Sequence, residues 1–365
     1  MSLTLKKRVR LMLTFQSGGV SLSGFNVKSF LMGLSLFWCS VSFTQAASHE
    51  LKVHHPLPVG STIHQQVLLP WCARIEELSS GDLKCRIFPS MQLGGTVPQL
   101  IDQVEDGVVD IIWTLPGYSP GRFLRSEVFE LPFMVRDAEG ASIALWHYIN
   151  DHAMEEFSGM KLLALHVHGG GVLHMTDTPI RTQKDLSRKK VRAPTRQTTK
   201  FLAMLGATPV GMPVPQVPEA LAKKVIEGTL LPYEVMPALK VKELTSYHSE
   251  PSVGEPKIYT STFVLAMSKQ AYAKLSMKLQ AIIDSESGEG LSGKIGKIFG
   301  DAEDKNRATL PADSINVISK LELDKWKKIS LPIRKNWILQ IDKLGGDGNA
   351  LFTSASELIK RYEAR

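Results

Sequence analysis

Apolar and polar residues alternate with two different periods from about residue 50 onward. Short apolar runs predict strands at 51–55, 83–88 and 110–115. Between them, apolar residues at near-helical spacing predict helices over 60–79 and 96–105, the first of which is stopped by a glycine. This βαβαβ order indicates a mainly parallel sheet that is covered by helices.

The same order of elements appears a second time. Strands are predicted at 190–193, 208–210 and 229–232, and helices are predicted at 195–205 and 217–227. Both stretches also contain a Pro-Gln pair, then an amphipathic helix closed by an acidic residue and glycine, then an apolar strand. We therefore expect two lobes that share one α/β plan, each with its own core.

The remaining segments are expected to join and support these lobes. Extended runs at 162–172 and 259–267 are interpreted as connections between the lobes. Farther on, helical spacing predicts helices at 275–283, 295–302, 315–337 (interrupted at Pro332) and 358–362. We expect lobe I to consist of residues 47–168 together with 265–310, and lobe II to consist of residues 169–264. Residues 311–365 are expected to form a C-terminal helical brace.

The first 46 residues differ in composition from the rest. They contain five basic residues and no acidic one, and they include the apolar run 30–43, which is too short for a comfortable membrane span. Small residues near Ala46 suit a signal peptidase, so 1–46 is predicted to be a signal peptide and the protein to be periplasmic. An uncleaved anchor is the alternative.

The net charge belongs largely to this leader. The whole chain carries a formal charge of +7, and subtracting the five leader cations leaves +2 (7 − 5) on the other 319 residues (365 − 46). A nearly neutral chain gives no reason to expect a nucleic-acid partner.

Cysteine and histidine spacing does not predict a metal centre. Cys72 and Cys85 are interpreted as buried free thiols, although an oxidising compartment would permit them to pair. His166 and His168 would share one face of a strand, yet no HExxH motif or carboxylate cluster accompanies them. We therefore predict no metal and no cofactor. The triple glycine 169–171 lacks the lysine and Ser/Thr of a phosphate loop and is interpreted as a flexible hinge.

The run KVRAPTR places an arginine where a strand gives way to a helix. Pro194 ends the strand, so Arg192 lies close to a helix N-terminus. Free N–H groups and the helix dipole favour an anion there, and a guanidinium offers two parallel donors to a carboxylate. We predict that Arg192 binds a carboxylate, with Arg196 and Arg181 as the alternative candidates and a solvated or structural ion-pair arginine as the alternative role.

Several segments taken together resemble one family, the extracytoplasmic solute-binding proteins of TRAP transporters (DctP-like). The strings that carry the resemblance are SSGDLKCRIFPSMQLGG, DGVVDIIWTLPGYSPGRF, FELPF, KVRAPTR and LGATPVGMPVPQVPEAL, in this order. The resemblance implies a two-lobed, periplasmic-binding-protein-like α/β fold that closes over an organic acid and presents it to a membrane permease. It also implies that the protein performs no chemistry on its ligand. A monomer is expected rather than a homodimer.

The resemblance also implies ligand contacts around Arg192. They come from the loop after the third strand and from the second lobe, and the matching positions are Trp113, Tyr118, Met212, Tyr233 and Glu234. Where many relatives have Asp-Gly after the second-lobe helix, this chain has Glu227 before the glycine.

Further candidates come from the residue types themselves. His54, His64 and His168 are expected near the hinge face, where an imidazole would hydrogen-bond a ligand hydroxyl or keto group. Phe263 joins the aromatic residues already named as a possible sandwich for an apolar or aromatic acid.

Two other function classes stay open at this level. An enzyme on the same two-lobed plan would use the histidines as acid, base or metal ligands. A sensor would hand its ligand-bound form to a membrane kinase. Among ligands, dicarboxylates, keto acids, hydroxy acids, aromatic acids and sugar acids would all satisfy one arginine.

Overall fold

The computed structural model describes residues 48–364 of the 365-residue chain. The predicted signal peptide lies outside the described residues. Within 48–364, none of the helices combines the length and the apolar character that a membrane crossing requires.

The first sheet, called sheet A, contains five strands. Its order is β2 (Leu83–Phe88), β1 (His49–His54), β3 (Ile111–Thr114), β10 (Thr262–Ser268) and β4 (Met160–Val167). Strand β1 runs parallel to β2 and β3, and β10 runs antiparallel to both of its neighbours. One strand of five is therefore reversed.

The second sheet, called sheet B, contains six strands. Its order is β11 (Ile315–Ile318), β9 (Tyr247–Pro251), β5 (Val172–Met175), β8 (Gly228–Leu231), β6 (Lys190–Ala193) and β7 (Thr208–Gly211). Only β5 runs against its neighbours. The expectation of two mainly parallel sheets is confirmed.

The two sheets share one order when sheet B is followed from β7. Sheet A reads β2, β1, β3, β10, β4, and sheet B reads β7, β6, β8, β5, β9, where β10 and β5 are the reversed strands. The reversed strand is in each case the one that has just arrived from the other sheet, since β4 leads to β5 and β9 leads to β10. The chain thus crosses between the sheets at 168–171 and at 252–261, and it returns to sheet B through the helical segment 269–314 that leads from β10 to β11.

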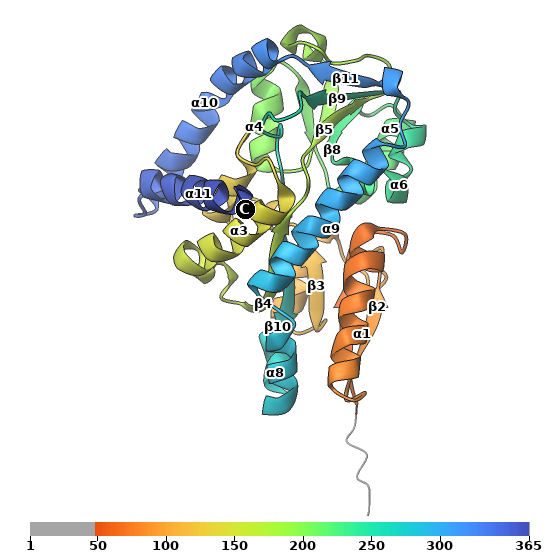
Figure 1. Ribbon diagram of the computed structural model, residues 1–365, viewed down its shortest axis with the longest axis vertical. Coiled ribbons are helices and arrows are strands. Elements are labelled where there is room, and N and C mark those ends of the chain that lie inside the picture. The colour runs from red at the N-terminus through yellow and green to blue at the C-terminus, as the bar shows by residue number, and fades with distance from the viewer. Residues whose placement is uncertain (1–47, 365) are drawn as a thin grey trace, which may run out of the picture. The chain divides into compact units, whose positions relative to one another are not determined.

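Helices cover the sheets and join them (Figure 1). The α-helices are α1 (Leu69–Leu78), α2 (Leu100–Glu105), α3 (Ala138–His152), α4 (Arg196–Met204), α5 (Val217–Ala222), α6 (Met236–Leu239), α7 (Lys269–Ala273), α8 (Met277–Ser285), α9 (Glu289–Arg307), α10 (Lys320–Lys343) and α11 (Gly348–Glu363). Shorter helical turns are η1 (Ile63–Leu68), η2 (Val97–Gln99), η3 (Pro116–Tyr118), η4 (Ser126–Glu130), η5 (Met154–Phe157), η6 (Gln183–Leu186), η7 (Val214–Gln216), η8 (Tyr233–Val235), η9 (Val241–Glu243) and η10 (Ala312–Ser314).

Helix α9 is shared by the two halves. It packs against α3 and β4 beside sheet A, and it also contacts η8, the turn that follows β8 of sheet B. Of the last two helices, α10 contacts α4 and α11 contacts α3. Trp337 of α10 donates from Nε1 to the carbonyl of Leu124 at 2.8 Å, which ties this helix to the segment after β3.

The predicted helix at 315–337 is wrong in two respects. Ile315–Ile318 forms β11, whose β-branched residues pair with β9, and the helix begins only after the Ser319 cap, whose Oγ accepts from the Glu322 N–H at 3.3 Å. The helix also passes through Pro332 without a break. Pro332 lies on the exposed face, where water can satisfy the carbonyl that loses its partner.

Strand membership also differs from the predicted lobe boundaries. Residues 262–264, assigned to lobe II, belong to β10 in sheet A, and β11, assigned to the brace, belongs to sheet B. The remaining boundaries stay a prediction.

The interpretation of the two cysteines as free thiols is also wrong. Cys72 and Cys85 form a disulfide, with their Cα atoms 5.7 Å apart. The chain turns back after α1 so that this helix packs directly on β2, which brings the two residues within bridging range.

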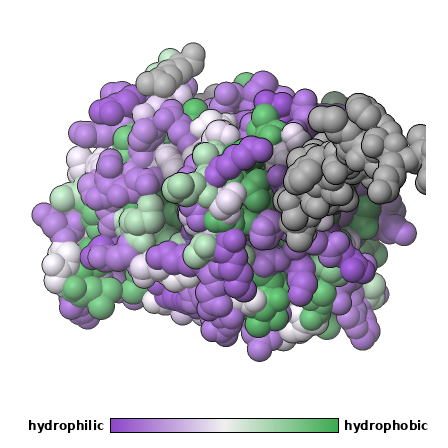
Figure 2. Space-filling view, turned by 90° about the horizontal axis from the view of Figure 1, so that it is seen from below, coloured by the Kyte–Doolittle hydropathy of each residue, from purple (hydrophilic) through white to green (hydrophobic). Residues whose placement is uncertain are grey.

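The surface seen from below is mixed in character. Among the described residues on this face, hydrophobic groups are interspersed with hydrophilic ones (Figure 2). The buried hydrophobic residues instead form one core cluster that includes strands of both sheets.

Candidate functional site

A small cavity of about 40 Å³ lies where residues from both sheets meet. Most of its lining is apolar or aromatic, and two charged residues, Arg192 and Glu234, belong to it. The lining residues are Pro56, Leu57, Trp113, Leu115, Tyr118, His168, Arg192, Pro194, Val214, Leu231, Pro232, Glu234, Val235, Tyr259, Ser261, Phe263 and Phe299.

Arg192 reaches the cavity from the C-terminal half of β6. Pro194 ends that strand, and Thr195 starts α4, since the Thr195 N–H donates to Thr198 Oγ1 at 2.9 Å. Nε of Arg192 donates to the Met212 carbonyl at 3.0 Å, and Nη1 donates to the Leu230 carbonyl at 2.9 Å. Two backbone oxygens therefore fix the plane of the guanidinium.

The charge of this guanidinium is left without a carboxylate partner. Arg192 is 1% exposed, and no ion pair joins it to an acidic residue of the described chain. Three of its N–H groups have acceptors, namely the two carbonyls and the Tyr118 hydroxyl at 3.4 Å. A guanidinium has five N–H donors, so one remains on each Nη atom. A buried cation with two free donors is suited to an anion, and to a carboxylate above all.

Tyr118 supplies a further donor beside this cation. Its hydroxyl oxygen accepts from the Val214 N–H at 3.0 Å as well as from Arg192. Burial raises the pKa of this phenol, so the group keeps its proton. With both incoming bonds on the oxygen, the hydroxyl proton is available for an acceptor in the cavity. Tyr118 follows β3 of sheet A, whereas Val214 and Arg192 belong to the half built on sheet B, so this oxygen also joins the two halves.

One wall of the cavity is a stack of flat rings. Trp113 and Phe263 lie with ring centroids 4.9 Å apart and an interplanar angle of 12°, and Phe263 stacks on His166 at 4.7 Å and 8°. Trp113 donates from Nε1 to His166 Nε2 at 2.9 Å, which leaves the proton of the neutral imidazole on Nδ1. Burial lowers the pKa of His166 to about 3. The wall is therefore uncharged.

Glu234 is the acidic group of the cavity. It is 4% exposed, and its Oε1 has no hydrogen-bond partner. The Thr62 side chain bonds to the carboxyl group, and burial raises the pKa of Glu234 to about 7. Its backbone N–H donates to Glu303 Oε2 at 2.8 Å, and burial likewise raises the pKa of Glu303, to about 8.

His168 lies where the chain crosses between the sheets. Its ring nitrogens lie 3.1 Å from the backbone N atoms of Gly170 and Ser261, and its carbonyl accepts from Thr260 Oγ1 at 3.0 Å. Burial lowers the pKa of His168 to about 3. The neutral ring thus links the two crossing segments at the edge of the cavity.

Six of the ten predicted site residues line this cavity. They are Trp113, Tyr118, His168, Arg192, Glu234 and Phe263.

The other four predicted residues do not line it. His54 bonds to Gln103 Oε1 at 2.8 Å, and His64 bonds to His55 at 2.9 Å. Tyr233 donates to Glu250 Oε2 at 3.0 Å in a separate region. Met212 acts through its backbone carbonyl, which positions Arg192.

The two alternative arginines are engaged elsewhere. Arg196 pairs with Glu127 and bonds to Gln340, so it links α4 to η4 and α10. Arg181 donates to Asn316 at 3.1 Å. Neither lines the cavity.

Glu227, which stands where many relatives have aspartate, has a structural role. Its carboxylate accepts from Lys189 Nζ and from the Lys190 N–H, both at 2.9 Å, and these bonds fix the start of β6. Glu227 does not line the cavity.

Several lining residues were not predicted. Tyr259 and Ser261 lie on the second crossing segment, and Phe299 comes from α9, far from the other lining residues in sequence. The positions of Pro56 and Leu57, directly after β1, offered a usable signal, because open α/β sheets bind ligands beyond the carboxyl ends of their strands.

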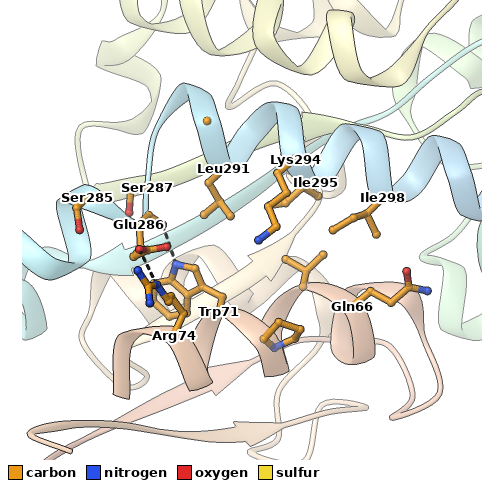
Figure 3. Close-up of a pocket in the computed structure, with 13 residues that line it drawn as sticks. Gln66, Trp71, Arg74, Ser285, Glu286, Ser287, Leu291, Lys294, Ile295 and Ile298 are labelled. Atoms are coloured by element: carbon orange, nitrogen blue, oxygen red, sulfur yellow. Dashed lines mark hydrogen bonds and ion pairs between the residues drawn. The ribbon is translucent and has the colours of Figure 1, made fainter. Parts of the chain in front are cut away.

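A larger crevice of about 200 Å³ lies between η1 and α1 on one side and α8 and α9 on the other (Figure 3). Its walls are tied by Trp71 Nε1, which donates to the Glu286 carbonyl at 2.8 Å, and by the ion pair of Arg74 with Glu286. The charged groups here are paired or exposed, so we assign the site to the smaller cavity, which holds the buried unpaired cation. Among residues 48–364, no group of three or more His, Cys, Asp or Glu is arranged to hold a metal ion.

The chain is similar to known binding proteins over most of its length. Residues 53–340 match the family model described as bacterial extracellular solute-binding protein, family 7. A solved TRAP solute-binding protein from Rhodoferax ferrireducens, in complex with copurified benzoate, is 44% identical, with a TM-score of 0.85 over 87% of this chain and 99% of that chain.

Two further relatives are informative. A marine metagenome TRAP solute-binding protein specific for aromatic acid ligands, solved with 3-hydroxybenzoate, is 40% identical with a TM-score of 0.84, over 87% of this chain and 99% of that chain. The outer membrane transporter protein TsaT of Comamonas testosteroni is 26% identical over 309 residues, which are 84% of this chain and 90% of TsaT. The structural matches confirm the expected two-lobed α/β fold.

Proposed function

Because the chain belongs to the bacterial extracellular solute-binding proteins of family 7, we propose that it captures an aromatic monocarboxylic acid in the cavity around Arg192. The predicted resemblance to TRAP solute-binding proteins is confirmed. The protein is thus the solute-binding component of a TRAP-type importer for a carboxylate-bearing organic acid, and such proteins work with membrane permease subunits.

The observation that carries the proposal is the buried, unpaired Arg192 beside a flat aromatic wall. The ligand carboxylate would receive the two free Nη donors and the Tyr118 proton, and hydrogen bonds to charged groups contribute about 1.5–3 kcal/mol each. An aromatic ring would lie against Trp113 and Phe263, where stacking adds about 0.5–1.5 kcal/mol beyond the buried area.

The same lining disfavours the other acid classes. A sugar acid presents many hydroxyl groups that a mostly apolar cavity would leave without partners. A dicarboxylate would bring a second carboxylate into a cavity that already contains the carboxyl group of Glu234. Relatives that are 44% and 40% identical bind benzoate and 3-hydroxybenzoate, which supports an aromatic ligand here.

Calorimetric titration of the purified protein with benzoate, succinate and gluconate tests this proposal. We expect binding of benzoate and, in Arg192→Ala, at least about a 100-fold loss of affinity, since the variant removes two charge-assisted bonds. Arg181→Ala is the matched control, because it also removes one arginine charge but leaves the cavity intact. Equal benzoate affinity in Arg192→Ala and wild type would show that another group binds the carboxylate.

Several finer points belong to the same proposal. Family 7 proteins and the solved relatives are solute-binding proteins and not enzymes; we infer that this chain also leaves its ligand unchanged, that residues 1–46 direct its export to the periplasm, and that it acts as a monomer. Ligand recovered unaltered, a mature N-terminus near Ala46 and a monomeric mass in light scattering are the expected results.

A further inference from the structure

Glu234 is a buried acid in the cavity whose bonding is incomplete. Its Oε1 has no hydrogen-bond partner, and the residue is 4% exposed. The other interactions of the residue are accounted for, since the Thr62 side chain bonds to the carboxyl group and the backbone N–H donates to Glu303. A buried acceptor that no group of the protein satisfies carries a desolvation cost, which a ligand donor would relieve.

The surroundings of Glu234 define which donor would fit. No hydrogen bond or ion pair joins its carboxyl group to a cation of the described chain. Arg192 also lines the cavity, but three of its N–H groups donate to Met212, Leu230 and Tyr118, and no hydrogen bond or ion pair joins it to Glu234. Most of the other residues that line the cavity are apolar, and Leu231 and Pro232 are among them. A ligand that reaches both would carry an acid at one point, an apolar body and a hydrogen-bond donor at another.

We propose that Glu234 is a specificity-determining residue that accepts a hydrogen bond from a ring hydroxyl, so that the ligand is a hydroxylated aromatic monocarboxylate. This inference rests on the proposed function, because it takes the ligand carboxylate to lie on Arg192. It goes further in assigning a second polar group to the ligand. An unsubstituted ring or a ring ether would leave Oε1 without a donor, and sites built to bond a hydroxyl reject analogues that lack it.

The test compares the purified wild type with Glu234→Met and Glu234→Gln. Each is titrated calorimetrically with benzoate, the three hydroxybenzoate isomers and the corresponding methoxybenzoates, whose ether oxygen cannot donate. In the wild type we expect at least one hydroxybenzoate to bind at least about tenfold more tightly than benzoate, and at least about tenfold more tightly than the corresponding methoxybenzoate. Methionine keeps the side-chain length without an acceptor, so Glu234→Met should reduce that ratio to below about threefold. The amide oxygen of Glu234→Gln should restore part of it.

Two controls separate a specific loss from general damage. Glu243→Met removes one carboxylate from an exposed position of the same half and should keep the wild-type ratio. Glu234→Met should keep the circular dichroism spectrum of the wild type and should still bind benzoate, which shows that the variant is folded and that Arg192 still binds. A wild type that binds benzoate and all hydroxybenzoates equally, or a Glu234→Met that keeps the preference, would overturn the inference but leave the proposed function intact. A wild type that binds no aromatic acid would overturn the proposed function itself.

Discussion

The C-terminal ends of β1 and β6 occupy equivalent places in their sheets but carry different chemistry. His54 of β1 lies opposite Ile112 of β3, and Arg192 of β6 lies opposite Thr229 of β8. Both side chains are buried. His54 is bonded to Gln103, and burial lowers its pKa, whereas Arg192 keeps two donors free toward the cavity. The repeated architecture therefore supplies two similar positions, and only one becomes a binding residue.

The difference follows from what each group does when it leaves water. An imidazole can lose its proton, so a buried histidine becomes a neutral structural residue. A guanidinium cannot be deprotonated in a protein, so a buried arginine keeps its charge and favours an incoming anion. The half built on sheet A thus contributes a neutral aromatic wall, and the half built on sheet B contributes the charge.

The largest expected effect comes from placing the cation in the wrong half. His54→Arg would bury a charge that Gln103 alone cannot neutralise, and we expect the free energy of unfolding to fall by about 3 kcal/mol. Urea unfolding followed by circular dichroism measures it. His54→Gln is the control, since it keeps a neutral hydrogen-bonding group. Unchanged stability in His54→Arg would mean that the end of β1 tolerates a cation as well as the end of β6 does.

The reciprocal change removes the cation from its own half. Arg192→His replaces a permanent charge by a group that burial would neutralise, and we expect about a 100-fold loss of aromatic-acid affinity at neutral pH, near 2.7 kcal/mol. Calorimetry against benzoate checks this. Affinity that returns as the pH is lowered toward 5 would show that a protonated imidazole can replace the guanidinium, and it would sharpen the comparison of the two residues.

A smaller loss is expected at the hydroxyl that connects the halves. Tyr118→Phe removes the acceptor of the Val214 N–H and the donor to the ligand, so benzoate affinity should fall about tenfold, near 1.4 kcal/mol. Titration calorimetry is again the measurement. Tyr272→Phe, which removes a tyrosine hydroxyl that donates to Asp284 and does not line the cavity, is the matched control. Full affinity in Tyr118→Phe would show that the two halves meet at the ligand without this bond.

The pH dependence of the free energy of unfolding should show the buried histidines and the buried glutamates separately. Burial lowers the pKa of His166, His168 and His174 to about 3, so the stability that they contribute is present above pH 6.5 and is lost as the pH falls toward 3. Burial raises the pKa of Glu234 to about 7 and of Glu303 to about 8, so their contribution is present below pH 4.5 and is lost as the pH rises through those values.

These opposite slopes partly cancel between pH 4.5 and 6.5, where we expect a broad stability maximum. Denaturant unfolding at pH 4, 5.5 and 8 would show it, with decreases on both sides. Glu303→Gln, which imitates the protonated acid, should flatten the alkaline decrease. Stability that climbs steadily from pH 5.5 to 8 would contradict the raised pKa values of Glu234 and Glu303.

The sequence predicted those strand boundaries that neighbouring residues determine. Strands 83–88 and 190–193 were predicted to the residue, because glycine or proline lies close to an end of each apolar run. Arg192 was found because a strand end before a helix start is readable from neighbouring residues. The disulfide was missed because it depends on α1 packing against β2, which no local pattern contains.

The rest of the cavity could not be found for a related reason. Phe299 reaches it only because α9 lies beside both halves of the fold, and the role of Met212 belongs to its carbonyl rather than its side chain. Tyr233 was expected in the cavity because the family resemblance implied it, but its hydroxyl donates to Glu250. Contacts set by tertiary packing or by backbone atoms leave no trace in residue type.

The reversed strand in sheet A has a consequence for how this protein is made. Strand β10 lies between β3 and β4, and its Val264 pairs with Thr114, 150 residues earlier (264 − 114). A chain that emerges N-terminus first must therefore leave the two neighbours of β10 unjoined until most of the other half has been synthesised. Sheet A begins first and closes late, so slow pairing over this long separation should limit the rate of folding. A chain truncated before residue 262 would expose the facing edges of β3 and β4, which makes truncation products of this protein candidates for aggregation.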